Sequence, residues 1–299
     1  MNRSFYLLTV FFITIFLFAG CSLKKDKNVK VGFLIHALDS ERWQNDRDFL
    51  VQKVEELGGT VIVKVADNDA NMQLAQAKEM LANGVDVLVV VPVDQFAAAD
   101  IVTEAHARNV AVISYDRLIK NCKLDYYVST DNVEIGSLQA TYLTTIKPEG
   151  NYALIGGAMG DNNSQLLYLG QRNVLQPLVE KGDIKIVYNE FTDHWGEEEG
   201  YEHALKIFAL PQKVDAIIAA NDAIGMGVIK AMQEKDIHNV LLAGMDADLR
   251  NLQEIVAGNQ TCTVYKPYDK LATTTAAGRL TVPPSAPCRF CRYSGFMHD

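Results

Sequence analysis

Short apolar runs alternate with longer amphipathic stretches along most of the chain. The first run covers 31–35 and is almost wholly apolar, which is typical of a central parallel strand covered on both faces. A polar turn follows, and an amphipathic stretch then predicts a helix that ends at Leu57. Ligands of open α/β sheets sit beyond the carboxyl ends of the strands. His36, Arg42 and Trp43 therefore lie where a small molecule is expected to bind.

The same strand and helix unit repeats in two series, separated by the proline- and glycine-containing turn predicted at 147–150. The further predicted strands are 60–66, 86–92, 110–115 and 126–130 in the first series, and 152–156, 184–188, 216–220 and 240–243 in the second. The predicted helices between them are 71–82, 95–108, 132–146, 164–181, 197–208, 223–235 and 248–257. Strands that alternate with helices of this length predict an α/β fold with doubly wound parallel sheets. Two series predict two Rossmann-like lobes with a ligand cleft between them.

The N-terminus has the pattern of an export signal. Arg3 precedes an apolar stretch from Phe5 to Ala19, and Cys21 follows at once. A transmembrane anchor is the alternative, but the stretch is shorter than the roughly 18 to 20 residues that span a bilayer. We therefore expect a lipoprotein signal peptide at 1–20, lipid attached to Cys21 and a tether at 21–28. The protein would then be held on a membrane in the periplasm or at the cell surface.

Composition narrows the class of protein. The chain has 299 residues and a formal net charge of −9, with no run of Lys or Arg, which argues against binding to nucleic acid. Cys122 and Cys262 are isolated, and Cys288 and Cys291 stand in a proline-containing tail without a second pair. These cysteines fit neither a disulfide framework nor a zinc site.

Polar residues end nearly every predicted strand, and some of them would be there in any case as helix caps. We expect Asp67, Asp69, Asp94 and Asp131 to cap helices or form turns, since Asp is favoured there. Asp116-Arg117 differs, because adjacent carboxylate and guanidinium groups at a strand end suit neighbouring hydroxyls of a ligand.

The two tryptophans, Trp43 and Trp195, each follow a predicted strand, one in each lobe. Indole faces stack on the apolar faces of sugar rings, so the pair predicts a ring held between the lobes. Packing at the edge of a core is the alternative for either tryptophan alone.

Several short motifs stand in a fixed order along the chain: Glu41-Arg42-Trp43-Gln44, Tyr115-Asp116-Arg117, Gly156-Gly157 followed by Asp161-Asn162-Asn163, Asn221-Asp222-Ala223, Asp246-Ala247-Asp248 and Thr263-Val264-Tyr265-Lys266-Pro267. Together they resemble the ribose/galactose-type periplasmic binding proteins, and among them those that bind xylose. The resemblance runs from about Lys30 to Thr275. It implies a type I periplasmic binding protein whose two lobes are joined by a hinge. The first lobe would comprise 29–130 and 265–277, and the second 131–264.

The resemblance also implies the contacts to the ligand and the partners. The chain is expected to cross between the lobes near 128–132 and again near 258–264. Sugar contacts are expected from side chains of both lobes and from the segment just past the second crossing: Arg42, Asp116, Arg117, Asn163, Asn221, Asp246 and Lys266, with stacking on Trp43 and Trp195. His36 stands where relatives often place a carboxylate. The implied ligand is D-xylose or a close aldose, bound by a monomer without metal or cofactor. The implied partner is the permease of an ABC importer, with a membrane sensor as the alternative.

Other functions fit the residues less well. A glycosidase needs a pair of carboxylates at a set separation, a role in which Asp116 and Asp246 can be imagined, but nothing marks a raised-pKa acid. The G-x-G-x-x-G turn of a dehydrogenase is absent after the first strand.

At 278–299 the chain departs from the resemblance, because prolines interrupt it and no periodicity remains. We expect an atypical tail there, either disordered or replaced by a shift of reading frame.

Overall fold

The computed structural model describes residues 28–281 and 289–293. The predicted signal peptide, the predicted lipidation site Cys21 and nearly all of the predicted tether lie outside these residues, as do 282–288 and 294–299 of the predicted tail. Within the described part of the chain, no helix is both long enough and apolar enough to cross a membrane.

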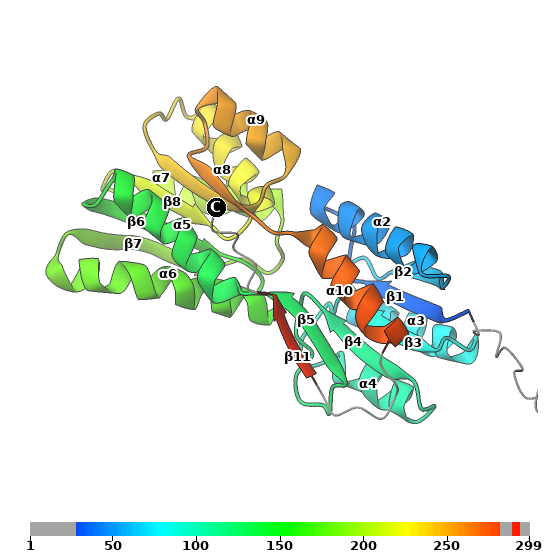
Figure 1. Ribbon diagram of the computed structural model, residues 1–299. Coiled ribbons are helices and arrows are strands. Elements are labelled where there is room, and N and C mark those ends of the chain that lie inside the picture. The colour runs from blue at the N-terminus through cyan, green and yellow to red at the C-terminus, as the bar shows by residue number, and fades with distance from the viewer. Residues whose placement is uncertain (1–27, 282–288, 294–299) are drawn as a thin grey trace, which may run out of the picture.

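The first lobe is a parallel sheet with helices on both faces (Figure 1). Its strands lie in the order β11-β5-β4-β3-β1-β2, each paired in parallel with its neighbours. They are β1 (Lys30–Ile35), β2 (Thr60–Val65), β3 (Val87–Val90), β4 (Ala111–Tyr115), β5 (Tyr126–Thr130) and β11 (Arg289–Tyr293). The helices are α2 (Glu41–Glu56), α3 (Ala70–Ala82), α4 (Ala99–His106) and α10 (Tyr268–Thr281).

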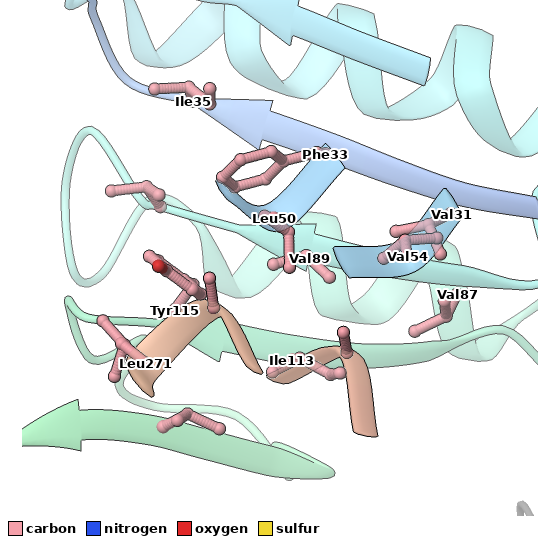
Figure 2. Close-up of a cluster of buried hydrophobic side chains, with 14 of the residues drawn as sticks. Val31, Phe33, Ile35, Leu50, Val54, Val87, Val89, Ile113, Tyr115 and Leu271 are labelled. Atoms are coloured by element: carbon pink, nitrogen blue, oxygen red, sulfur yellow. The ribbon is translucent and has the colours of Figure 1, made fainter. Parts of the chain in front are cut away.

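Alternation along β1 explains how both faces of this sheet are covered. Phe33 packs with Leu50 of α2 and Leu271 of α10 in one apolar cluster, and Figure 2 shows these side chains between the sheet and the two helices. Leu34 belongs to the opposite cluster, which contains Met80 of α3. Successive side chains of a strand point to opposite faces, so a wholly apolar run is what a sheet covered on both sides requires.

The second lobe repeats this design with five strands among the described residues, in the order β10-β9-β8-β6-β7. Its strands are β6 (Gly150–Gly156), β7 (Ile184–Phe191), β8 (Ala216–Ala219), β9 (Leu241–Asp246) and β10 (Cys262–Tyr265). Its helices are α5 (Asn132–Ile146), α6 (Asn162–Lys181), α7 (Glu197–Phe208), α8 (Asp222–Glu234) and α9 (Leu249–Ala257). The predicted α/β fold with two parallel-sheet lobes is confirmed.

The chain passes between the lobes in two places within the described residues. It leaves the first sheet at the end of β5, and α5, which begins at Asn132, packs on α6 of the second lobe. It returns after β10, because α10 packs on α2 in the first lobe. Figure 1 shows β5 and the start of α10 at the boundary between the lobes. The carboxyl ends of both sheets therefore face each other.

Two segments differ from the sequence prediction. Helix α4 begins at Ala99 rather than at residue 95, because Asp94 accepts hydrogen bonds from the amides of Phe96 and Ala97 and holds a turn there. In the predicted irregular tail, residues up to Thr281 continue α10, and β11 pairs with the open edge of β5. An unpaired strand edge offers backbone donors and acceptors to any extended segment. Such pairing depends on the backbone, so the pattern of apolar side chains does not predict it.

Helices α5 and α6 touch backbone to backbone at two glycines. A Cβ atom on Gly170 would lie 2.0 Å from the carbonyl oxygen of Val133, and one on Gly136 would lie 2.0 Å from that of Leu167. The hydroxyl of Ser137 also donates to the carbonyl of Gly170 at 3.3 Å. Any side chain at either glycine would force the two helices apart.

Replacement of Gly170 by alanine is therefore expected to lower the free energy of unfolding by about 1 to 3 kcal/mol, the usual cost of overpacking. Gly225→Ala is the matched control, since Gly225 lies inside α8 but the nearest atom to its added Cβ is 3.5 Å away. The control should be neutral or gain up to about 1 kcal/mol from helix propensity. Urea unfolding followed by circular dichroism measures both, and equal stabilities would contradict the close helix contact.

Candidate functional site

A pocket of about 370 Å³ lies between the lobes at the carboxyl ends of the strands. Its lining residues come from both lobes and from the second crossing: Asp39, Ser40, Arg42, Trp43, Asp116, Arg117, Asp161, Asn163, Trp195, Asn221, Met245, Asp246 and Lys266. Every residue that the sequence analysis predicts as a sugar contact lines this pocket, except His36.

Asp116 is the centre of the charged groups in the pocket. One of its carboxylate oxygens lies 2.8 Å from Nη2 of Arg42 and 2.8 Å from Nζ of Lys266. The other accepts a hydrogen bond of 3.1 Å from the side-chain amide of Asn163 in the second lobe. Burial alone would raise the pKa of Asp116, but Arg42 and Lys266 hold it well below its usual range. The carboxyl group is therefore ionised and acts as an acceptor.

The backbone at two of the four aspartates that line the pocket, Asp116 and Asp246, is left-handed. Asp116 has φ of 59° just after β4, and Asp246 has φ of 108° at the end of β9. Such conformations cost non-glycine residues about 1 to 3 kcal/mol each and persist only where the surrounding structure holds them. Around Asp116 the strain is contained, because its carbonyl accepts hydrogen bonds from the hydroxyls of Tyr127 and Ser129. The sequence analysis did not predict this conformation.

Arg42 is held by a carboxylate that the sequence analysis did not identify. Asp46 lies one turn further along α2, is fully buried and accepts from Nε of Arg42 at 3.0 Å. It also accepts a hydrogen bond from the hydroxyl of Tyr115. The signal was present in the sequence, because Asp46 falls on the apolar face of α2 with Trp43 and Leu50. A charged residue on such a face needs a buried partner.

Arg117 connects the two lobes. Its Nε lies 2.9 Å from a carboxylate oxygen of Asp161, which caps the N-terminus of α6 in the second lobe. Its Nη2 lies 3.1 Å from Nε2 of His36. Asp161 lines the pocket and also accepts from the amide of Asn163. The sequence analysis includes Asp161 among the resembling motifs but does not predict it as a contact.

His36 lies behind the pocket wall rather than in it. It is 2% exposed, and its ring meets Trp43 edge to face with 4.6 Å between the centroids. Burial and the charges of Arg117 and Arg42 lower its pKa well below the usual value. The structure places His36 against Trp43 and Arg117, which line the pocket while His36 does not, so its contact with a ligand stays a prediction. Since Arg117 can only donate, Nε2 is the acceptor and Nδ1 is assigned the proton.

The two tryptophans approach the pocket from opposite lobes. Trp43 is 6% exposed, and the guanidinium of Arg42 lies 4.3 Å from its ring centroid. The ring of Trp195 rests on Gly157, where an added Cβ would lie 2.3 Å from it. The indole N–H of Trp195 is buried and has no hydrogen-bond partner among the described residues. Each tryptophan therefore packs at the edge of a core and lines the pocket as well.

Asp246 supplies a second carboxyl group, and its charge is less fixed than that of Asp116. Burial raises its pKa to about 7, against the opposing charges of Arg42 and Lys266. The nearest guanidinium nitrogen of Arg42 is 3.6 Å away. Near neutral pH this group can therefore donate or accept a hydrogen bond. No cluster of three or more His, Cys, Asp or Glu that could hold a metal occurs in the part of the chain that the structure describes.

The lowered pKa of His36 predicts a loss of stability in acid. Below about pH 6.5, the histidine of the unfolded chain takes up a proton that the folded chain does not bind. Between pH 7.5 and 5.5 the unfolding free energy should fall by about 1.4 kcal/mol more for the natural protein than for His36→Gln. Glutamine keeps an acceptor for Arg117 but does not titrate. Urea unfolding over this pH range measures the difference, and a constant difference would mean that His36 protonates normally in the folded protein.

Comparison with known proteins gives consistent matches over both lobes. Residues 31–277 match the family described as periplasmic binding protein domain. The D-xylose-binding periplasmic protein of Haemophilus influenzae is 42% identical over 254 residues, which is 84% of this chain and 76% of the relative. The protein of the same name from Escherichia coli is 43% identical over 256 residues, with the same coverage.

Solved structures resemble this protein in fold as well. A carbohydrate transporter solute-binding protein from Chloroflexus aurantiacus, in complex with D-glucose, superposes with a TM-score of 0.81 at 26% identity, covering 89% of this chain and 92% of that one. A myo-inositol-binding protein from Caulobacter gives a TM-score of 0.78 at 23% identity, covering 89% and 93%. The family match spans both lobes and the pocket residues between them. The chain therefore belongs to the periplasmic binding proteins, which bind their ligands and are not enzymes.

Proposed function

We propose that this protein binds a monosaccharide, D-xylose first among them, in the pocket between its lobes. It would do so in the periplasm and deliver the sugar to the permease of an ABC importer. One observation supports this most strongly: both lobes bring charged side chains and a tryptophan to a single pocket of about 370 Å³. The names of the two relatives above 40% identity support D-xylose as the ligand.

The chemistry of the lining suits a polyol. Each sugar hydroxyl both donates and accepts, and the ionised Asp116 accepts while Arg42 and Lys266 donate. Hydrogen bonds to charged groups contribute about 1.5 to 3 kcal/mol each. Because the sugar is neutral, the buried ion pairs remain balanced when it binds. The two indole rings cover its apolar faces.

Contacts across the boundary explain how binding is coupled to closure. Arg117 pairs with Asp161, and the backbone N–H of Gln95 donates to the backbone carbonyl of Gly160 at 3.0 Å. Both contacts join residues of different lobes, so they form only when the lobes are together. A sugar that contacts both lobes stabilises the closed arrangement through its differential affinity for it, as in hinge closure around a ligand.

Titration of the chain from Ser22 onward with pentoses and hexoses tests the ligand. We expect a saturable change in tryptophan fluorescence with D-xylose, a weaker one with other sugars, and a smaller radius of gyration by X-ray scattering on binding. No response from a sample that unfolds cooperatively would refute the sugar assignment. Uptake of labelled xylose by cells with and without the gene then separates an importer subunit from a sensor protein, which would use the same pocket.

Asp116→Asn should weaken D-xylose binding by at least tenfold, because it removes the charge that Arg42 and Lys266 share. Removing one partner of a buried ion pair costs about 3 to 5 kcal/mol, so the unfolding free energy should fall as well. Asp94→Asn is the matched control: Asp94 also follows a strand, but it caps a turn outside the pocket, where asparagine serves equally. Isothermal titration calorimetry compares them, and equal affinities would exclude Asp116 from the site.

A further inference from the structure

A second pocket, of about 630 Å³, lies beside the first. The two share three lining residues, Asp39, Ser40 and Trp195. Beyond them the second pocket is lined by the first turns of α7 and α8 and by the N-terminal part of α9, with Glu197, Met226 and Arg250 among its side chains. Nothing in the proposed binding of a monosaccharide uses this space.

The boundary between the two pockets is a seam between lobes. Asp39 and Ser40 precede α2 in the first lobe, whereas Trp195 precedes α7 in the second. These residues meet only by closure, because they belong to different lobes. The two pockets therefore adjoin at residues of both lobes, which an opening of the hinge would separate.

Two polar groups at the seam leave hydrogen-bonding capacity unused among the described residues. Ser40 occupies the N-cap of α2 but makes no capping hydrogen bond with its side chain. The indole N–H of Trp195 is buried without a hydrogen-bond partner among the described residues. A buried donor without an acceptor is unfavourable, so an oxygen atom of a ligand placed between these groups would be stabilised.

The charges of the second pocket disfavour an anionic occupant. Glu197 pairs with Arg250 at 3.0 Å, while Glu41 and Asp248 are further acidic groups in the lining. The excess of carboxylates repels anionic substituents such as uronic acids or phosphates. The charged side chains of the second pocket can bind hydroxyl groups, and Met226 and the ring of Trp195 add apolar surface. The first pocket has the same combination.

We propose that the second pocket is a subsite for a neutral second sugar unit, so that the protein also takes a disaccharide built from pentoses. The inference rests on the proposed function, because the first unit occupies the first pocket as D-xylose does. The glycosidic oxygen lies at the seam beside Ser40 and Trp195, and the second ring lies between Met226 and the Glu197–Arg250 pair.

Calorimetric titration with xylobiose and with D-xylose tests this subsite. We expect both sugars to bind with one site per chain and D-xylose to displace xylobiose. Glu197→Ala and Arg250→Ala should each weaken xylobiose about tenfold and change D-xylose less than twofold. Glu198→Ala is the matched control, since Glu198 is the next residue on α7 but is exposed and outside the lining.

The outcomes separate the two proposals. Binding of D-xylose without binding of xylobiose overturns the subsite and leaves the proposed function in place. Binding of xylobiose that Glu197→Ala and Arg250→Ala weaken no more than Glu198→Ala also overturns it. Binding of neither sugar by a cooperatively folded sample overturns both proposals.

Discussion

The buried carboxylate of Asp116 is the interaction on which the site depends. It neutralises Arg42 from α2 and Lys266 from the segment that returns from the second lobe, and it also receives the amide of Asn163. Without it, Lys266 would lose its ion pair and Arg42 would lose one of its carboxylate partners, and breaking a buried ion pair is costly. One side chain thus joins a helix of the first lobe, a helix of the second lobe and the connection between them.

A further layer of residues keeps these groups in position. Asp46 fixes Arg42 from within the same helix, and His36 accepts from Arg117. Neither residue lines the pocket. Their partners are long side chains with many rotamers, and a ligand site gains affinity when such chains are immobilised before binding. This need to immobilise long side chains explains why charged groups are buried next to the apolar core in the N-terminal turns of α2.

The sequence predicted the fold well because strand and helix periods are local properties. It also predicted the gathering of Arg42, Asp116 and Asp246, since parallel strands place their carboxyl ends at one edge. It could not predict that His36 is absent from the pocket lining, because the length of the neighbouring side chains decides which group reaches the pocket. Nor could it predict the left-handed backbone at Asp116 or the pairing of β11, which depend on hydrogen bonds from distant segments.

The left-handed backbone at Asp116 and Asp246 also bears on how such a protein changes its ligand over evolutionary time. Asparagine and glycine adopt this conformation readily, whereas branched or bulky residues do not. Few single substitutions at the two strand ends would leave the fold intact. Helical positions such as Arg42 and Asn163 carry no such restriction. New specificities are therefore expected to arise through the helix termini, around a pair of aspartates that stays constant.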